Sequence, residues 1–132
     1  KYGVEEGTPL KNAILEFSYK NDALGDPMIN DMQITAIGIA TVEELKTISE
    51  NALKINELMK KFFIERNIIL VDFKIEFGKY QNRIILADEV SPDTCRLWDA
   101  NTKQKLDKDR FRRDLGGVEE AYEEVWKRIT SK

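Results

Sequence analysis

The stretch Asp72 to Gly78, DFKIEFG, decides the fold of this chain. It follows the apolar run of residues 68–71 and alternates apolar with ionisable side chains. Alternation with a period of two predicts a β-strand with one apolar and one ionisable face. The apolar face holds Val71, Phe73, Ile75 and Phe77, and the ionisable face holds Asp72, Lys74 and Glu76. Because strands disfavour Asp and Glu, carboxylates beside a lysine indicate a ligand or metal site.

A second apolar stretch, residues 82–87 (NRIILA), follows after a short turn and ends in Asp88 and Glu89. Two such stretches predict an antiparallel hairpin. A turn centred near Asn82 places Asp88 opposite Glu76, with Cβ atoms about 5 Å apart. A divalent cation relieves repulsion between close carboxylates, and Mg²⁺ takes one or two of them together with substrate phosphates. The pattern indicates a Mg-nucleotide phosphoryl-transfer site, and an exposed hairpin with chance acids is the alternative.

Length and composition predict one modest globular domain over residues 1–132. The chain is 42% hydrophobic and 34% charged, which is ordinary for a soluble protein. A net charge of -3 argues against general nucleic-acid binding. Cys95 is the only cysteine, and no apolar run approaches the roughly 20 residues that span a bilayer, so we expect a cytoplasmic protein with no membrane partner. Without histidine, a zinc site or a histidine-dependent triad is excluded within this chain.

Two longer helices are predicted. Thr41 and Glu44 have the spacing of a capping box, which begins a helix that runs to about Arg66. Its apolar stripe consists of Leu45, Ile48, Ala52, Ile55, Met59 and Phe62. A last helix carries the stripe Val118, Tyr122, Val125 and Ile129. Together with the strands, these helices indicate an α+β fold, mainly antiparallel sheet packed against helices.

The remaining segments mix turn signals with charged residues. Residues 13–19 (AILEFSY) predict a strand, and residues 31–40 receive no assignment. The polar loop 20–27 (KNDALGDP) carries Lys20 and Asp26, which suit a ligand, although such residues also make ordinary turns. Residues 103–113 include six basic residues, but acids interrupt them, so a solvated face is the default interpretation.

Residues 91–99 (SPDTCRLWD) place Arg96 just beyond a turn that Pro92 and Asp93 indicate. The planar guanidinium of Arg96 suits a phosphate or a carboxylate. A salt bridge from Arg96 to Asp93 or Asp99 explains the same pattern equally well.

Residues 68–78 (IILVDFKIEFG) followed by residues 85–99 (ILADEVSPDTCRLWD) closely resemble the signature region of the SAICAR synthetase family. The similarity continues through GVEEGTPL and KNDALGDPMIN upstream and DKDRFRRDLGGVEEAYEEV downstream, so it covers nearly the whole chain. It implies an ATP-dependent ligase of purine biosynthesis that joins L-aspartate to carboxyaminoimidazole ribonucleotide through an acyl phosphate. It also implies a SAICAR-synthase-like fold from which the amino-terminal nucleotide-covering subdomain is absent here. The isolated chain is then expected to be inactive.

The resemblance assigns a role to individual residues. Lys20, Asp72 and Lys74 are implied to be catalytic, and Lys20, Asp26, Glu76 and Asp88 to bind ATP. Asp72, Glu76 and Asp88 are implied to hold Mg²⁺. The ribonucleotide pocket is implied to consist of Ser91, Asp93, Arg96, Lys108, Asp109 and Arg112. ATP and Mg²⁺ are the expected cofactors, and the partners are small-molecule substrates and further copies in a homo-oligomer.

Two other functions stay open at this point. Small-molecule and lipid-inositol kinases share a related fold and a shorter Asp-x-Lys-x-Gly strand motif, which makes a Mg-ATP phosphotransferase the first alternative. The SPDTCRLWD segment has no place in those kinases. A non-catalytic cation-binding module is the second alternative, and retention of all the candidate ligands argues against it.

Overall fold

The computed structural model describes residues 2–88 and 90–131, so Glu89 lies outside the described residues. The chain divides into two compact units, residues 1–53 and 54–132. Helix α2 (Val42–Ile64) contributes to both units. The single domain expected from the sequence stays a prediction.

The first unit contains a small antiparallel sheet and a short helix. Strand β1 (Phe17–Ser18) pairs with β2 (Met28–Ile29), and the 3-10 helix η1 (Asp22–Leu24) lies in the loop between them. The strand predicted over residues 13–19 is therefore much shorter than expected. Helix α1 (Asp31–Ile37) follows in the segment that received no assignment.

Helix α2 begins as the sequence predicts. The Glu44 amide donates to the Thr41 hydroxyl at 3.1 Å, and the Thr41 amide donates to the Glu44 carboxylate at 3.1 Å. One detail of the predicted apolar stripe is wrong, because Phe63 is 6% exposed whereas Phe62 is 41% exposed. The Arg66 guanidinium lies 3.7 Å above the exposed Phe62 ring.

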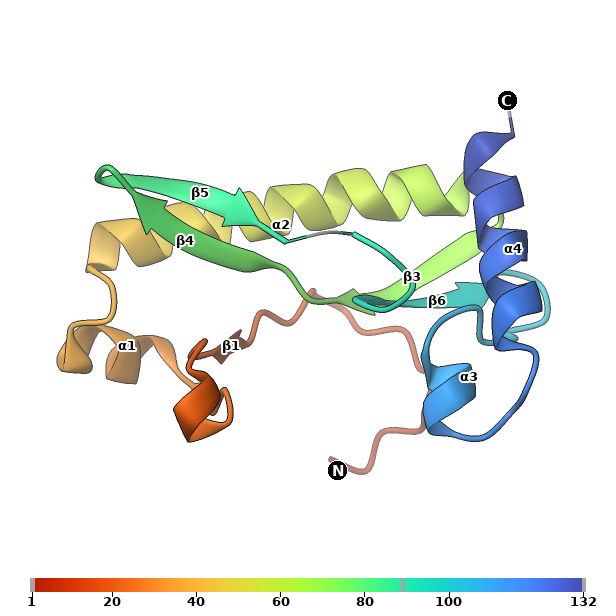
Figure 1. The fold of residues 1–132 in the computed structure, drawn as a ribbon, viewed down its shortest axis with the longest axis horizontal. Coiled ribbons are helices and arrows are strands. Elements are labelled where there is room, and N and C mark those ends of the chain that lie inside the picture. Colours follow the sequence, from red (N-terminus) through yellow and green to blue (C-terminus); the bar gives the residue numbers. More distant parts are fainter. Residues whose placement is uncertain (1, 89, 132) are drawn as a thin grey trace. The chain divides into compact units, whose positions relative to one another are not determined.

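Strands β3 (Ile68–Phe73) and β6 (Cys95–Asp99) form an antiparallel sheet in the second unit (Figure 1). Leu70 pairs with Leu97, but the register shifts by one residue before Asp72, which pairs with Arg96. Val71 is the extra residue of this bulge and is 41% exposed. The predicted core position of Val71 is thus wrong, because the inserted residue lets Leu70 and Phe73 both pack against the core.

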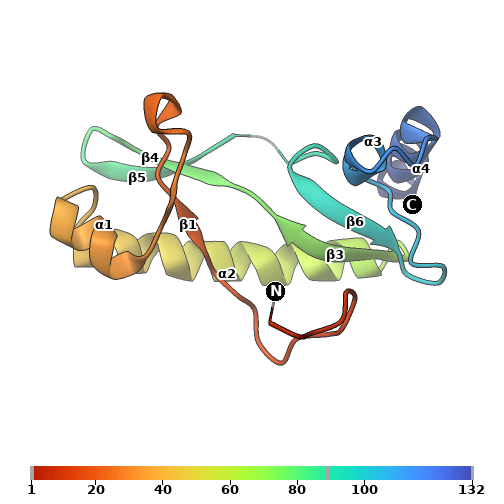
Figure 2. The same ribbon diagram turned by 90° about the horizontal axis from the view of Figure 1, so that it is seen from below.

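Strands β4 (Glu76–Tyr80) and β5 (Arg83–Ala87) form the predicted hairpin, joined by a turn at residues 81–82 (Figure 2). The continuous strand predicted through residues 72–78 is interrupted at residues 74–75. The hairpin register also differs by one residue from the prediction, since Glu76 pairs with Ala87 and not with Asp88. Asp88 follows the strand with a φ of 76°, a conformation that ends the regular pairing.

The core of the second unit consists mainly of side chains from β3, β6, the end of α2 and the last helix. Helices α3 (Asp109–Arg112) and α4 (Val118–Thr130) complete this unit. Its buried residues are Phe63, Ile68, Cys95, Leu97, Leu106, Ala121 and Val125. Glu124 and Arg128, one turn apart on α4, form an ion pair at 2.8 Å. Three two-stranded antiparallel sheets combined with these helices confirm the predicted α+β class.

Among the described residues, no helix is both long and apolar enough to cross a membrane.

Candidate functional site

Arg96 is the centre of an ion-pair cluster on the β3–β6 sheet. The register shift at Val71 places Asp72 directly opposite Arg96. The Arg96 Nη1 group donates to Asp72 Oδ2 at 2.6 Å, and Arg96 Nε donates to Asp109 Oδ2 at 2.9 Å. Of the two partners that the sequence offered for Arg96, Asp93 and Asp99, neither is the one observed. The hydrogen bond to Asp72 raises the pKa of Arg96 above its ordinary value, so this side chain carries a fixed positive charge.

Asp109 links Arg96 to a second arginine. Its Oδ1 atom accepts a hydrogen bond from Arg112 Nη1 at 3.1 Å. The Asp109 side chain is only 4% exposed, whereas those of Arg96 and Arg112 are 46% and 49% exposed. Burial raises the pKa of Asp109, but the hydrogen bond from Arg112 and the charge of Arg96 outweigh it, so the net shift is downward. A buried carboxylate therefore holds two half-exposed guanidinium groups in place, a geometry that suits a phosphate or carboxylate ligand.

The turn before β6 is fixed from both sides. The Asp93 amide donates to the Ser91 hydroxyl at 3.2 Å, and the Tyr122 hydroxyl on α4 donates to Asp93 Oδ1 at 2.7 Å. The Lys108 amide, at the start of α3, donates to the Pro92 carbonyl at 3.0 Å. Backbone contacts thus connect the segment that carries Ser91 and Asp93 to the segment that carries Lys108.

The predicted ribonucleotide-binding residues all lie in the second unit. Direct ion pairs join Arg96, Asp109 and Arg112. Ser91 and Asp93 lie in the turn that leads into β6, and Lys108 lies at the start of α3 and bonds to that turn. Their roles in binding stay predictions.

Asp107 and Tyr122 are two members of this region that the sequence did not single out as functional. Asp107 is 1% exposed and accepts the amides of Leu97 at 2.6 Å and Asp109 at 2.8 Å. In the sequence, Asp107 only interrupts a basic run, and Tyr122 only fills an apolar stripe. The position of Asp107 between Leu106 and Asp109 could have indicated its role. That role becomes clear only from the structure, in which residues 104–107 run back along β6.

The hairpin carries the residues that were expected to hold Mg²⁺. Glu76 begins β4, and Asp88 directly follows Ala87, the residue that pairs with Glu76. Among residues 2–88 and 90–131, no group of three or more His, Cys, Asp or Glu side chains is arranged to hold a metal ion. Because the observed register pairs Glu76 with Ala87, the strand pairing no longer places Asp88 on the same sheet face as Glu76, so a joint Mg²⁺ site of these two carboxylates stays a prediction. Asp72, the third predicted ligand, instead bonds Arg96 here.

The predicted residues Lys20 and Asp26 lie together in the first unit. Lys20 Nζ is 3.6 Å from Asp26 Oδ2 and 3.3 Å from Asp22 Oδ1. The other Asp26 oxygen accepts the Asn21 amide at 2.7 Å, which holds the loop in a tight turn with Asp26 at a φ of 48°. Lys74 lies in the second unit between β3 and β4, and its amide donates to the Thr94 carbonyl at 2.8 Å.

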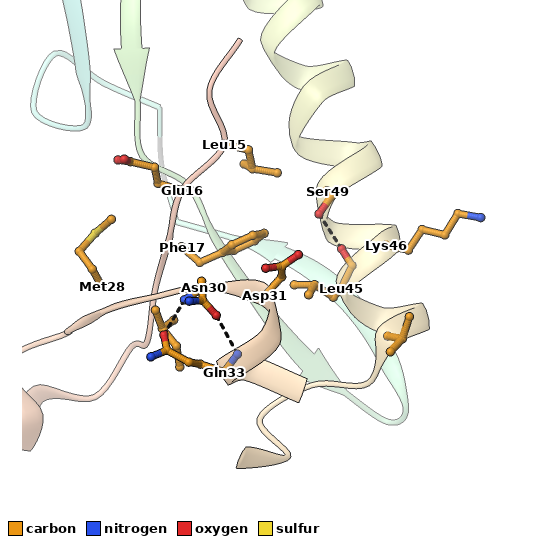
Figure 3. Close-up of a pocket in the computed structure, with 12 residues that line it drawn as sticks. Leu15, Glu16, Phe17, Met28, Asn30, Asp31, Gln33, Leu45, Lys46 and Ser49 are labelled. Carbon is orange, nitrogen blue, oxygen red and sulfur yellow. Dashed lines mark hydrogen bonds between the residues drawn. The ribbon is translucent and has the colours of Figure 1, made fainter. Parts of the chain in front are cut away.

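The first unit also contains a groove between its small sheet, α1 and the beginning of α2 (Figure 3). Leu15, Phe17, Ile29 and Leu45 give it an apolar lining, and Glu16, Asp31 and Lys46 contribute charged groups. Asn30 and Gln33, joined by the capping hydrogen bonds, also line the groove. None of the predicted site residues lines this groove.

Comparisons with known proteins give a consistent result. The family model described as SAICAR synthetase matches residues 1–129. The phosphoribosylaminoimidazole-succinocarboxamide synthase of Lachnoclostridium phytofermentans is 64% identical over 129 residues, which cover 98% of this chain and 55% of that protein. A corresponding enzyme from Clostridium kluyveri is 61% identical over 130 residues, with the same two coverages. A solved structure described as SAICAR synthetase (Type-2) in complex with ADP is 54% identical, with a TM-score of 0.91 over 98% of this chain and 55% of its own. The chain therefore spans about half the length of the curated relatives that it matches.

Proposed function

The chain belongs to the SAICAR synthetase family, and we propose that it works in an ATP-dependent carbon–nitrogen ligase of purine biosynthesis. The substrates would be ATP, L-aspartate and carboxyaminoimidazole ribonucleotide. The chain covers about 55% of the length of these relatives, so the activity is proposed for a protein that carries this chain together with the other segments that the relatives contain.

The proposed reaction proceeds in two steps. A carboxylate oxygen of the ribonucleotide attacks the terminal phosphorus of ATP, ADP leaves, and an acyl phosphate forms. The aspartate amine then attacks the acyl carbon, the amine loses a proton, and inorganic phosphate leaves. Both steps develop negative charge on the transferred phosphoryl group, and fixed positive charges stabilise such transition states.

The ribonucleotide would bind at the Arg96 cluster. The observation that carries this proposal is that two carboxylates fix Arg96, while its side chain stays 46% exposed. Among the described residues, the Nη2 group of Arg96 makes no hydrogen bond. It is therefore available to the ribonucleotide phosphate together with Arg112. Ser91, Asp93 and Lys108 border the same region and would contact the remainder of this substrate.

The ATP phosphates would bind near the start of the hairpin. Glu76 and Asp88 would hold Mg²⁺, which supplies charge neutralisation at the phosphate oxygens when it is bound. Lys74 would place its ammonium group against the transferred phosphoryl group. Lys20 and Asp26, in the loop of the first unit, are likewise proposed to bind ATP. Asp72 is proposed as a further metal ligand or catalytic group, since only its Oδ2 atom is bound by Arg96 and its side chain is 54% exposed.

A substitution at Arg96 tests the substrate assignment. Arg96→Ala removes a charge-assisted contact, so the KM for the ribonucleotide should rise by roughly 10- to 100-fold while the KM for ATP changes little. Arg83→Ala, at the turn end of the hairpin, is the matched control and should leave both values near those of the parent enzyme. Equal effects of the two variants on the ribonucleotide KM would overturn the assignment.

An isotope measurement tests the acyl phosphate. With oxygen-18 in the carboxylate of the ribonucleotide, one labelled oxygen should appear in the released phosphate. Phosphate without label would contradict the proposed intermediate and favour a route in which the amine does not displace phosphate from the substrate carbon.

A further inference from the structure

A buried carboxylate, that of Asp107, lies beside the Arg96 cluster. Asp107 is 1% exposed, and each of its two oxygens accepts one backbone amide. Oδ2 binds the Leu97 amide at 2.6 Å, and Oδ1 binds the Asp109 amide at 2.8 Å. The first amide belongs to the residue after Arg96, and the second belongs to the residue whose carboxylate holds Arg96.

These two contacts fix two separate segments relative to each other. Arg96 extends from β6, whereas Asp109 begins α3. The Asp107 carboxylate connects the backbones of the two segments next to the point where their side chains meet at 2.9 Å. Leu106 adds one further contact, because its amide donates to the Leu97 carbonyl at 2.7 Å.

We propose that Asp107 is a positioning residue that sets the geometry of the Arg96–Asp109 pair for the anionic group of the substrate. This inference rests on the proposed function of Arg96. Asp107 itself does not reach the ligand, because its side chain is buried and both of its oxygens are engaged with backbone amides. It acts on the substrate through the position of the Arg96 guanidinium.

Asp107→Asn is the direct test in the full-length enzyme. The amide side chain keeps one acceptor oxygen but sets an NH₂ group against a backbone N–H donor, so one of the two contacts is lost. Because small displacements of a binding group weaken binding strongly, we expect the KM for the ribonucleotide to rise about tenfold. The KM for ATP should change less than twofold.

Asp99→Asn is the matched control for a purely structural effect. Asp99 lies on the same strand, is 8% exposed and likewise accepts two backbone amides, those of Asn101 and Thr102. It contacts Arg128 and not Arg96. The Asp99→Asn variant should lose thermal stability and keep the ribonucleotide KM of the parent enzyme. If both variants raise the ribonucleotide KM equally, Asp107 acts only through general stability and the proposal fails.

A double-mutant cycle separates this inference from the proposed function. If Asp107 acts through Arg96, Asp107→Asn should add little to the KM effect of Arg96→Ala, whereas independent sites would show additive effects. If Arg96→Ala alone leaves the ribonucleotide KM unchanged, the proposed function of Arg96 fails, and this inference fails with it. If Arg96→Ala raises the KM but Asp107→Asn does not, only the positioning role is overturned.

A second variant covers the case in which Asp107→Asn does not fold. Asp107→Glu keeps the charge and both acceptor oxygens but lengthens the side chain by one methylene, so it displaces the two segments without removing their acceptor. We expect a ribonucleotide KM between those of the parent enzyme and Arg96→Ala. A KM equal to that of the parent enzyme in a folded Asp107→Glu variant would contradict the proposal.

Discussion

Asp99 and Asp107 both bind backbone amides in the β6 region, yet their surroundings shift their pKa values in opposite directions. Hydrogen bonds from the Thr102 amide and from Arg128 outweigh burial at Asp99, so its pKa is lowered. Burial is the largest effect at Asp107, and its two amide hydrogen bonds do not compensate for it, so its pKa is raised. The balance of burial, hydrogen bonds and neighbouring charges thus decides in which direction the pKa of each carboxylate moves.

This contrast predicts how stability depends on pH. The folded-state pKa of Asp99 lies below its ordinary value of 3.8, so Asp99 stabilises the fold above about pH 3.8 and loses that contribution as the pH falls further. Asp99→Asn should therefore reduce the fall in unfolding free energy between about pH 4 and about pH 2. Urea unfolding at a series of pH values measures this fall. A slope identical in variant and parent would show that Asp99 does not carry the effect.

A second prediction concerns the hydroxyl of Tyr122. Its hydrogen bond to Asp93 holds the turn before β6 against α4. Tyr122→Phe should lower the unfolding free energy by about 1.5 kcal/mol because one hydrogen bond to a charged group is lost. Tyr80→Phe is the control, since Tyr80 is 63% exposed on β4. Equal unfolding midpoints for the two variants would argue against a role for the Tyr122 contact.

At the scale of elements, the sequence predicts periodic and capped segments well. The capping box of Thr41 and Glu44 and the β4–β5 hairpin are both confirmed. Periodicity assigns no element to residues 31–40, although Asn30, Gln33 and Gly38 mark the beginning and the end of α1. The Asn30 side chain accepts from the Gln33 amide, and Gly38 adopts a φ of 85°. The capping signal was present in the sequence, but weak alternation obscured it.

The bulge in β3 could not be predicted from alternation. The order of apolar and ionisable residues in 68–77 is the same with or without a bulge. The bulge nevertheless changes which side chains face the core. The single-residue difference in the hairpin register has a similar origin, because composition locates a turn only to within a residue. For this reason all four charged members of the Arg96 cluster could be named from the sequence, but the pairing of Asp72 with Arg96 could not be predicted.

The bulge predicts different stability losses for substitutions at two adjacent residues of β3. Leu70→Ala should lower the unfolding free energy by about 2 kcal/mol or more, because Leu70 packs against the core. Val71→Ala should cost less than about 1 kcal/mol, because Val71 is 41% exposed. Denaturant unfolding of both variants measures the difference. A larger loss for Val71→Ala would mean that the strand has the regular register.

The capping box at the beginning of α2 likewise predicts a stability loss when its capping residue is replaced. Thr41→Ala removes the capping oxygen for the Glu44 amide and should cost roughly 0.5–2 kcal/mol. Thr47→Ala is the matched control, because its hydroxyl only donates back to the Glu43 carbonyl within the helix. The control should be neutral or slightly stabilising. If Thr47→Ala is the more destabilising variant, the cap does not hold this end of α2.

At the scale of the whole molecule, the chain matches about 55% of the length of its relatives. The predicted nucleotide and ribonucleotide residues divide between two compact units, with Lys20 and Asp26 in one and the Arg96 cluster and the hairpin in the other. The family could be predicted from the sequence because several separate motifs occur in order. The geometry of the Arg96 cluster depends on contacts between distant segments, which only the structure supplies.

The most direct test of the proposed ligase is ADP formation by the full-length enzyme with carboxyaminoimidazole ribonucleotide and Mg²⁺, with and without L-aspartate. We predict that sustained ADP formation requires both substrates and yields the succinyl amide as the product. Sustained phosphoryl transfer to another acceptor without aspartate would contradict the ligase and indicate a phosphotransferase. No turnover under either condition would contradict both and leave a cation-binding module.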